Sequence, residues 1–308
     1  MSNSKKSPPP IVYIGGALAL ASLGYFAFGK LSGNNSNAPA PIVSSENASP
    51  GSETKSTFEV PATVTKGSVV RVGGSTSMAQ INQSLKTGFE KKFPGVQALA
   101  ISSSSGKGLT DLAAGSIDVT GVSRELTAAE KSQGLVAVPI TQDKIAIIIG
   151  VSNSFIAGNG LTSDQVTKIF TGKAKNWSEV GGKSQPIQPV LRPANSGTHQ
   201  SFQELGLKGQ SFGSGGSFKV LERDATTPMI QALGTDGIGY ATFAQVASQS
   251  TARVLEIDGI NPEFANYPYR RTLAYVYKGT PNDAVKAFLG FATSGEGQQL
   301  INQQSQNK

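Results

Sequence analysis

The sequence predicts an α/β protein, in which short buried strands alternate with helices. Apolar runs are repeatedly followed by a turn rich in Gly, Ser or Thr and then by an amphipathic stretch. The first example is the strand expected at Val69–Val72, followed by a helix whose buried stripe is Met78, Ile81, Leu85 and Phe89. The 36 glycines among 308 residues agree with many tight turns. Because strands that alternate with helices usually run in the same direction, we expect largely parallel sheets.

The same reasoning places the other elements. Thr162 to Gln165 form a capping box, which predicts that a helix begins there. Ile145 to Ile149 form an uninterrupted apolar run, which predicts a buried strand. Beyond the first strand and helix, strands are expected at 99–101, 143–151, 189–191, 237–243 and 272–277. Helices are expected at 109–114, 162–170, 196–205 and 282–293.

The N-terminus is expected to lie outside this fold. Lys5 and Lys6 precede an uncharged run from Ile11 to Gly29, which Lys30 ends. We interpret residues 1–30 as a transmembrane anchor, with the rest of the chain on the outer face of the cytoplasmic membrane. The alternative is a cleaved signal segment, which would release the protein into the periplasm. Residues 31–67 are rich in Ser, Asn, Ala, Pro and Gly and predict a disordered linker.

Composition excludes several classes of function. The chain has no cysteine, which rules out disulfides, thiolate metal sites, a cysteine nucleophile and a lipid-modified cysteine. It has one histidine, His199, and its charge of +7 is spread along the chain without a basic stripe. We therefore expect no metal, no cofactor and no nucleic-acid partner. A mildly positive protein instead suits a small anion.

Three segments share a design that binds anions. Residues 73–77, 104–108 and 192–198 each join an expected strand to a helix through Gly, Ser and Thr. Unpaired N–H groups at a helix N-terminus attract an anion, and hydroxyl groups add further hydrogen bonds. Each serine taken alone is equally typical of an N-cap. The three turns together, with Arg192 at the start of the third, predict a site for a tetrahedral oxyanion.

These turns belong to a longer series of motifs. In order, the chain carries Gly74-Ser75-Thr76, Ser105-Gly106-Lys107-Gly108, Ser123-Arg124-Glu125-Leu126, Phe170-Thr171-Gly172 with Asn176-Trp177 and Gly181-Gly182, and Arg192 with Ser196-Gly197-Thr198. Over about residues 68–303 the sequence resembles the phosphate-binding proteins of phosphate ABC importers (the PstS type), in a Ser-Arg-Glu-Leu variant. The resemblance implies a two-lobed, hinged protein of the type II periplasmic binding class, and inorganic phosphate and the importer's permease subunits as partners.

The resemblance also implies the lobes and the site. Lobe I would be 68–148 with 268–308, lobe II would be 149–267, and the hinge would lie near 145–151 and 272–277. The phosphate-binding residues carried over are Thr76, Ser77, Ser105, Arg192, Ser196, Gly197 and Thr198.

The residue after Ser123 departs from the best-known pattern. Well-known members have an aspartate there, which accepts the proton of phosphate, whereas this chain has Arg124. Arg124 is included in the predicted site as a second cation, and the alternative is that it pairs with Glu125 or Glu130 at the surface. Asp143 and Glu125 are then the candidates for the proton acceptor.

Two other functions remain open at this stage. One is an oxyanion sensor or scavenger with the same binding chemistry and no transport partner. The other is an exported phosphoryl- or acyl-transfer enzyme, for which Ser196 and His199 are the only nucleophile and base close in sequence at a helix start. Without a positioned carboxylate or a G-x-S-x-G elbow, we predict that the protein is not an enzyme. Lys107 and His199 are expected to be exposed, and Trp177 to pack its own loop.

Overall fold

The computed structural model describes residues 58–155 and 160–306, all within one compact unit, Thr54–Lys308. The anchor or signal segment predicted at 1–30, and most of the linker predicted at 31–67, lie outside the described residues. Among the helices of the described ranges, none is both long enough and apolar enough to cross a membrane.

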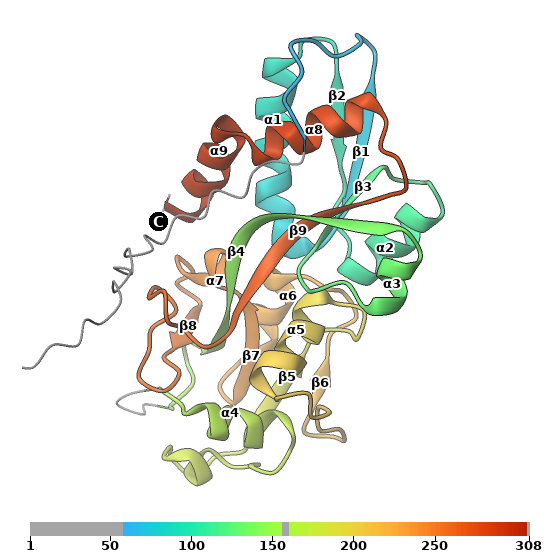
Figure 1. Cartoon of the computed structure of the whole chain (residues 1–308). Coiled ribbons are helices and arrows are strands. Elements are labelled where there is room, and N and C mark those ends of the chain that lie inside the picture. Colours follow the sequence, from blue (N-terminus) through green and yellow to red (C-terminus); the bar gives the residue numbers. More distant parts are fainter. Residues whose placement is uncertain (1–57, 156–159, 307–308) are drawn as a thin grey trace, which may run out of the picture. The chain divides into compact units, whose positions relative to one another are not determined.

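The elements form two groups joined by two long strands (Figure 1). Group I contains β1 (Val69–Gly74), α1 (Ala79–Lys92), β2 (Gln97–Ala100), α2 (Ser105–Ala113), β3 (Val119–Val122), α3 (Ala128–Ser132), α8 (Asp283–Thr293) and α9 (Gly295–Gln306). Group II contains α4 (Ser163–Phe170), β5 (Gln188–Leu191), α5 (Gly197–Gly206), β6 (Lys219–Val220), α6 (Thr226–Ala232), β7 (Gly237–Thr242), α7 (Phe243–Val246) and β8 (Ala252–Leu255). The joining strands are β4 (Leu135–Gly150) and β9 (Arg270–Lys278), and two 3₁₀ turns, η1 (Thr76–Met78) and η2 (Trp177–Val180), complete the elements described.

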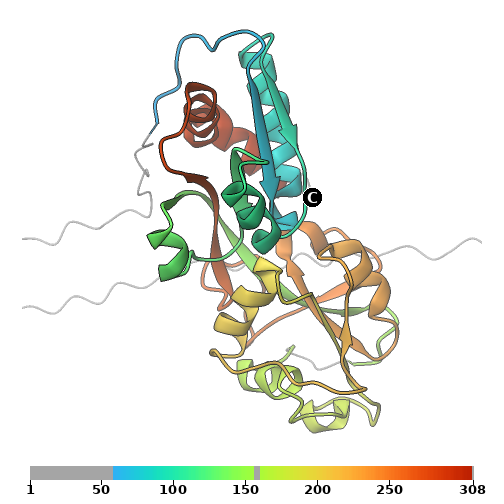
Figure 2. The same ribbon diagram turned by 90° about the vertical axis from the view of Figure 1, so that its right-hand side faces the viewer.

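The sheet is mixed rather than largely parallel. Its strand order is β2-β1-β3-β9-β4-β7-β5-β6, with β8 paired to β4. The β1–β2, β1–β3, β5–β6 and β5–β7 pairs are parallel, whereas every pair that includes β4 or β9 is antiparallel. Within each group, crossover helices give the parallel pairing that the sequence predicts. The two joining strands run in opposite directions because one leaves group I and the other returns to it (Figure 2).

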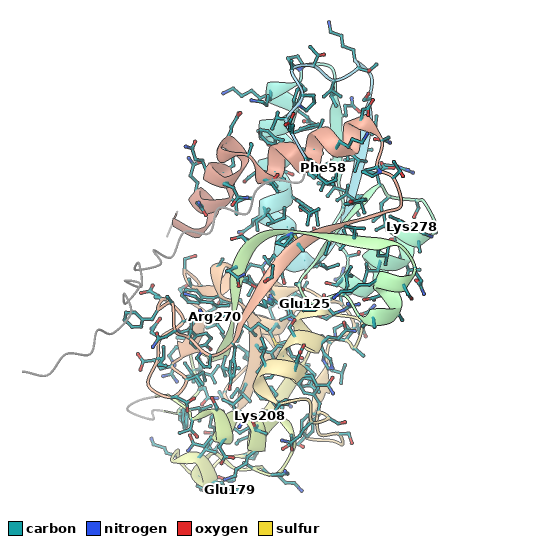
Figure 3. The ribbon with its side chains drawn as sticks, viewed as in Figure 1. Phe58, Glu125, Glu179, Lys208, Arg270 and Lys278 are labelled. Carbon is teal, nitrogen blue, oxygen red and sulfur yellow. The ribbon has the colours of Figure 1, made fainter. Side chains whose placement is uncertain are left out.

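The pairing of β4 with β9 is longer than the sequence predicts. It extends from Leu135↔Lys278 to Lys144↔Arg270, with a shift of register between Pro139 and Thr141. Figure 3 labels Arg270 and Lys278, the residues at the two ends of β9. Proline has no N–H to donate to a strand ladder, and this weakens the strand pattern along the first half of β4.

Each group has its own buried core. In group I, Phe89 packs against Phe288 and Phe291, with ring centroids 5.4 and 5.9 Å apart. In group II, Trp177 packs against Phe155 at 4.5 Å and is 1% exposed, which confirms its predicted packing role. The side chains of Ile145, Ile147 and Ile149 lie in this second core. Along β4, the side chains pass from the first core to the second between Ile140 and Ile145.

Residues 58–67, which the composition assigns to the linker, pack against group I. Phe58 (labelled in Figure 3), Val60 and Val64 contact its core. The rings of Phe58 and Tyr277 meet edge to face, with centroids 5.6 Å apart. Gly67 donates its N–H to the carbonyl of Gly95 at 2.7 Å. Three separated apolar residues suffice to attach an otherwise polar segment, because each gains from leaving water.

Candidate anion-binding site

The three turns singled out in the sequence each contain a serine that caps a helix or 3₁₀ turn. Ser75 accepts a hydrogen bond from the N–H of Ser77 at 3.3 Å, and Ser104 accepts from that of Lys107 at 3.1 Å. Ser196 accepts from the N–H of His199 at 3.2 Å and caps α5. Each serine therefore has the N-cap role that was the alternative reading of these residues, and the three caps precede η1, α2 and α5.

Five buried hydroxyl groups meet where these turns converge. We call Ser75, Ser77, Ser105, Ser123 and Thr198 the hydroxyl cluster. The hydroxyl of Ser75 donates to that of Ser123 at 3.0 Å, and the hydroxyls of Ser105 and Ser123 lie 3.3 Å apart. The hydroxyls of Ser77 and Thr198 lie 3.0 Å apart. None of the five residues is more than 7% exposed, so the cluster is a buried polar centre to which both groups contribute.

Gly197 lets the N-terminus of α5 reach this cluster. A Cβ atom at Gly197 would lie 2.2 Å from Oγ of Ser105 and 2.5 Å from Oγ of Ser123. Both serines belong to group I, whereas Gly197 is the first residue of α5 in group II. Only a residue without a side chain allows the two groups to approach this closely.

Arg271, at the start of β9, is the cation in contact with the cluster. Its Nη1 donates to Oγ1 of Thr198 at 2.9 Å, and its Nη2 donates to Oγ of Ser77 at 3.0 Å and Oγ1 of Thr242 at 2.8 Å. Its residue exposure is 6%. Sequence reasoning missed this residue. The available signal was its position directly before the strand predicted at 272–277.

Asp143 neutralises Arg271 across the joining strands. The two residues are opposite each other in the β4–β9 ladder, and Nε of Arg271 donates to Oδ2 of Asp143 at 2.8 Å. Burial raises the pKa of the Asp143 carboxyl, and the ion pair with Arg271 opposes that rise. Asp143, one of the two predicted proton acceptors, thus contacts the guanidinium that touches the cluster. Glu125, the other one, is exposed (Figure 3).

Arg192 lies beside the site with its guanidinium paired within group II. Its Nη1 donates to Oδ1 of Asp224 at 2.7 Å, its Nη2 to Oγ1 of Thr226 at 2.9 Å, and its Nε to the carbonyl of Tyr240 at 3.4 Å. These contacts use three of the five N–H groups that an arginine carries. Arg192 is 1% exposed, and its charge helps to lower the pKa of Arg271, after the larger effect of burial.

Arg124 lies between β3 and α3 and is held by Glu130 of α3 rather than by the cluster. Its Nη1 and Nη2 donate to the two carboxylate oxygens of Glu130, at 2.8 and 2.6 Å. The Arg124 hydrogen bonds hold the pKa of Glu130 below its usual range. This geometry matches the alternative weighed for Arg124 from the sequence, in which it pairs with Glu130.

Two other polar residues near the turns have local partners. Nδ1 of His199 lies 3.0 Å from the hydroxyl of Tyr240, and its ring packs against that of Phe212 in a tilted arrangement, with centroids 4.2 Å apart. His199 is thus half-buried rather than exposed, and burial lowers its pKa. Its imidazole faces Tyr240 and not the hydroxyl of Ser196, which is the contact that a serine nucleophile would need. Lys107 pairs with Asp111 at 2.5 Å on the surface, as expected of a solvated charge.

A groove runs between the two groups outside the cluster. A cavity of about 680 Å³ is lined by Thr76, Ser104 and Lys107 from group I and by Asn195 and Asp224 from group II. Thr76 is half-buried at this wall, next to the buried Ser75 and Ser77. The groove therefore leads to the turns that carry the cluster.

Comparison with known proteins places this architecture in a family. Residues 44–296 match the model of the PBP superfamily domain. The chain belongs to the PBP superfamily. Among curated PBP-type relatives, the phosphate-binding protein PstS of Bacillus subtilis (strain 168) is 28% identical over 238 residues, which are 75% of this chain and 77% of that protein. The phosphate-binding protein PstS of Borreliella burgdorferi is 25% identical over 254 residues, which are 77% of this chain and 88% of that protein.

A solved structure shows the same PBP-superfamily architecture. A Clostridium perfringens protein, assigned as a phosphate ABC transporter substrate-binding protein, was crystallised with bound phosphate. It is 28% identical to this chain, with a TM-score of 0.69, and the match covers 77% of this chain and 97% of that one.

Proposed function

We propose that this chain is an extracytoplasmic binding protein that captures inorganic phosphate and delivers it to an ABC importer, without catalysing a reaction. The proposal rests mainly on the buried hydroxyl cluster and Arg271, to which both groups of elements contribute. The names of the PstS relatives and the phosphate in the Clostridium perfringens structure support the choice of anion.

The chemistry of the cluster suits hydrogen phosphate. Hydroxyl groups donate hydrogen bonds to phosphate oxygens and also accept a hydrogen bond from the P–OH group of a protonated phosphate, which backbone N–H groups and arginine cannot do. Arg271 and Arg192 are each paired with an aspartate, so the site gains donors without a large excess of positive charge. The phosphate-binding set we propose is Thr76, Ser77, Ser105, Ser196, Gly197 and Thr198, with Arg192 at its edge and Arg271 added.

We propose that groups I and II are the two lobes and that β4 and β9 form the hinge. Ser77 and Thr198, which come from different groups, would then each contact the anion, and binding would favour closure. The apolar run at 11–29 supports our further proposal of a membrane tether, with permease subunits as partners. Recovery of a peptide from residues 1–30 in the membrane fraction tests the tether, and a mature N-terminus near residue 41 would overturn it.

Calorimetry of the purified chain against phosphate, arsenate, sulfate and molybdate tests the anion assignment. We expect phosphate and arsenate to bind, because they have the same geometry and carry a proton near neutral pH. Small-angle scattering should show a smaller radius of gyration with saturating phosphate. Heat from sulfate or molybdate but none from phosphate would overturn the proposal.

Arg124→Ala should change phosphate affinity by less than about threefold, because its guanidinium is occupied by Glu130. The same change should lower the melting temperature at pH 7. Since the folded pKa of Glu130 is depressed, its stabilising effect is present above the ordinary value of about 4.3 and is lost as the pH falls. The difference in melting temperature should therefore shrink as the pH falls from about 4.3 toward the depressed pKa of Glu130, and vanish only below that pKa. A loss of affinity greater than tenfold would return Arg124 to the anion site.

A further inference from the structure

A chain of hydrogen bonds links Arg192 in group II to the first turn of group I. Nη2 of Arg192 donates to Oγ1 of Thr226, which donates to Oε1 of Gln245 at 2.5 Å. Nε2 of Gln245 then donates to the backbone carbonyl of Thr76 at 2.8 Å. Asp224 holds the other end of the chain through Nη1 of Arg192.

Gln245 is the residue at which this series of hydrogen bonds crosses from group II to group I. It lies in α7, directly after β7, and it is half-buried in the wall of a second cavity, which shares Thr76 and Ser102 with the groove. Its two contacts need opposite roles, because Thr226 requires an acceptor and the Thr76 carbonyl requires a donor. A side-chain amide supplies both from one planar group, whereas a carboxylate accepts only.

We propose that Gln245 is a positioning residue that couples the anion site to closure of the lobes. The inference rests on the proposed function and goes beyond it, because Gln245 is not in the proposed phosphate-binding set. Its bond to Thr76 exists only when the two groups are in contact. Its bond to Thr226 fixes the hydroxyl that holds Arg192. Gln245 therefore slows reopening and, in the same arrangement, orients the arginine at the edge of the site.

The decisive variant is Gln245→Glu, which keeps the shape and the acceptor for Thr226. It replaces the donor to Thr76 by a carboxylate oxygen that faces a carbonyl oxygen, so the contact becomes repulsive. Phosphate dissociation, followed by stopped-flow fluorescence of Trp177, should be about tenfold faster, and association should change less than twofold. Lowering the pH toward 5 should restore part of the affinity, since a protonated carboxyl donates again.

Gln249→Glu is the matched control. Gln249 lines the same second cavity as Gln245 and is exposed, and it differs from Gln245 because, within the described residues, its side chain makes no hydrogen bond to group I. The same charge is thus added beside the same cavity. The ratio of the phosphate dissociation rates of the two variants, taken at each pH, removes general effects of charge and of phosphate ionisation. Far-ultraviolet circular dichroism and melting without phosphate verify that both variants fold.

The outcomes separate this inference from the proposed function. If wild type binds phosphate and the two variants release it at rates within twofold of each other, Gln245 has no coupling role. If wild type itself binds no phosphate, both proposals fall together. If Gln245→Glu is less folded than the control, Gln245→Ala is measured in its place, and the same twofold criterion decides.

Discussion

Replacing Arg271 by methionine is expected to weaken phosphate binding by roughly a hundredfold or more, which corresponds to about 2.7 kcal/mol. Arg271 contacts Ser77 and Thr198, one from each group, and is almost completely buried. A charge-assisted donor in such a place is worth more than one at the surface, because solvent does not screen it. Calorimetry at pH 7 measures the loss directly.

The single change also leaves Asp143 buried without its partner, so a control is needed. In Asp143→Asn with Arg271→Met, both charges are absent and the amide keeps the size of the carboxylate. If Arg271 acts on the anion, the melting temperature of this double variant should be closer to that of wild type than the melting temperature of Arg271→Met is. Its phosphate affinity should nevertheless be as low as that of Arg271→Met. Recovery of wild-type affinity in the double variant would show that Arg271 serves only to neutralise Asp143.

The importance of Arg271 could not be inferred from local sequence patterns. Asp143 and Arg271 are 128 positions apart, and they meet because β4 and β9 pair in one particular register. That register depends on the irregularity near Pro139, which no apolar periodicity reveals. The turns were predictable because an N-cap and the helix after it are within a few residues of each other.

The two other arginines illustrate the same limit. The partner of Arg124 is six residues away, and a pairing with Glu130 could be weighed from the sequence. The partner of Arg192 is Asp224, 32 residues away on the far side of β6, and nothing in the sequence near Arg192 indicates it. The motif thus located the third turn, whereas the direction of its guanidinium depended on tertiary structure.

The close approach of α5 to group I also could not be predicted from the sequence. The Ser-Gly-Thr triplet at 196–198 predicts a helix start, and glycine is common there for its backbone alone. The structure gives Gly197 a second reason, the close contact with Ser105 and Ser123. That reason can be tested separately from helix formation, since Gly197 does not have a positive φ angle.

Gly197→Ala should lower phosphate affinity by at least about thirtyfold while leaving the chain folded. Alanine is favoured over glycine in a helix by up to about 1 kcal/mol, so α5 itself should not suffer. The new Cβ would lie 2.2 Å from Oγ of Ser105 and 2.9 Å from its Cβ, which rotation of the hydroxyl alone cannot relieve. Either the two groups separate or the hydroxyl cluster rearranges, and each removes contacts that the anion needs.

Gly295→Ala provides the matched control, because Gly295 begins α9 as Gly197 begins α5, and a Cβ atom added there would meet no atom within 4 Å. It should bind phosphate like wild type. With saturating phosphate, scattering should give Gly197→Ala a larger radius of gyration than Gly295→Ala, and the two should melt alike without phosphate. Adding Ser105→Gly to Gly197→Ala removes the two atoms of residue 105 nearest the new methyl group and should restore part of the compaction. Equal affinity and equal compaction of the two alanine variants would mean that the groups meet elsewhere when phosphate is bound, and that Gly197 serves the helix start alone.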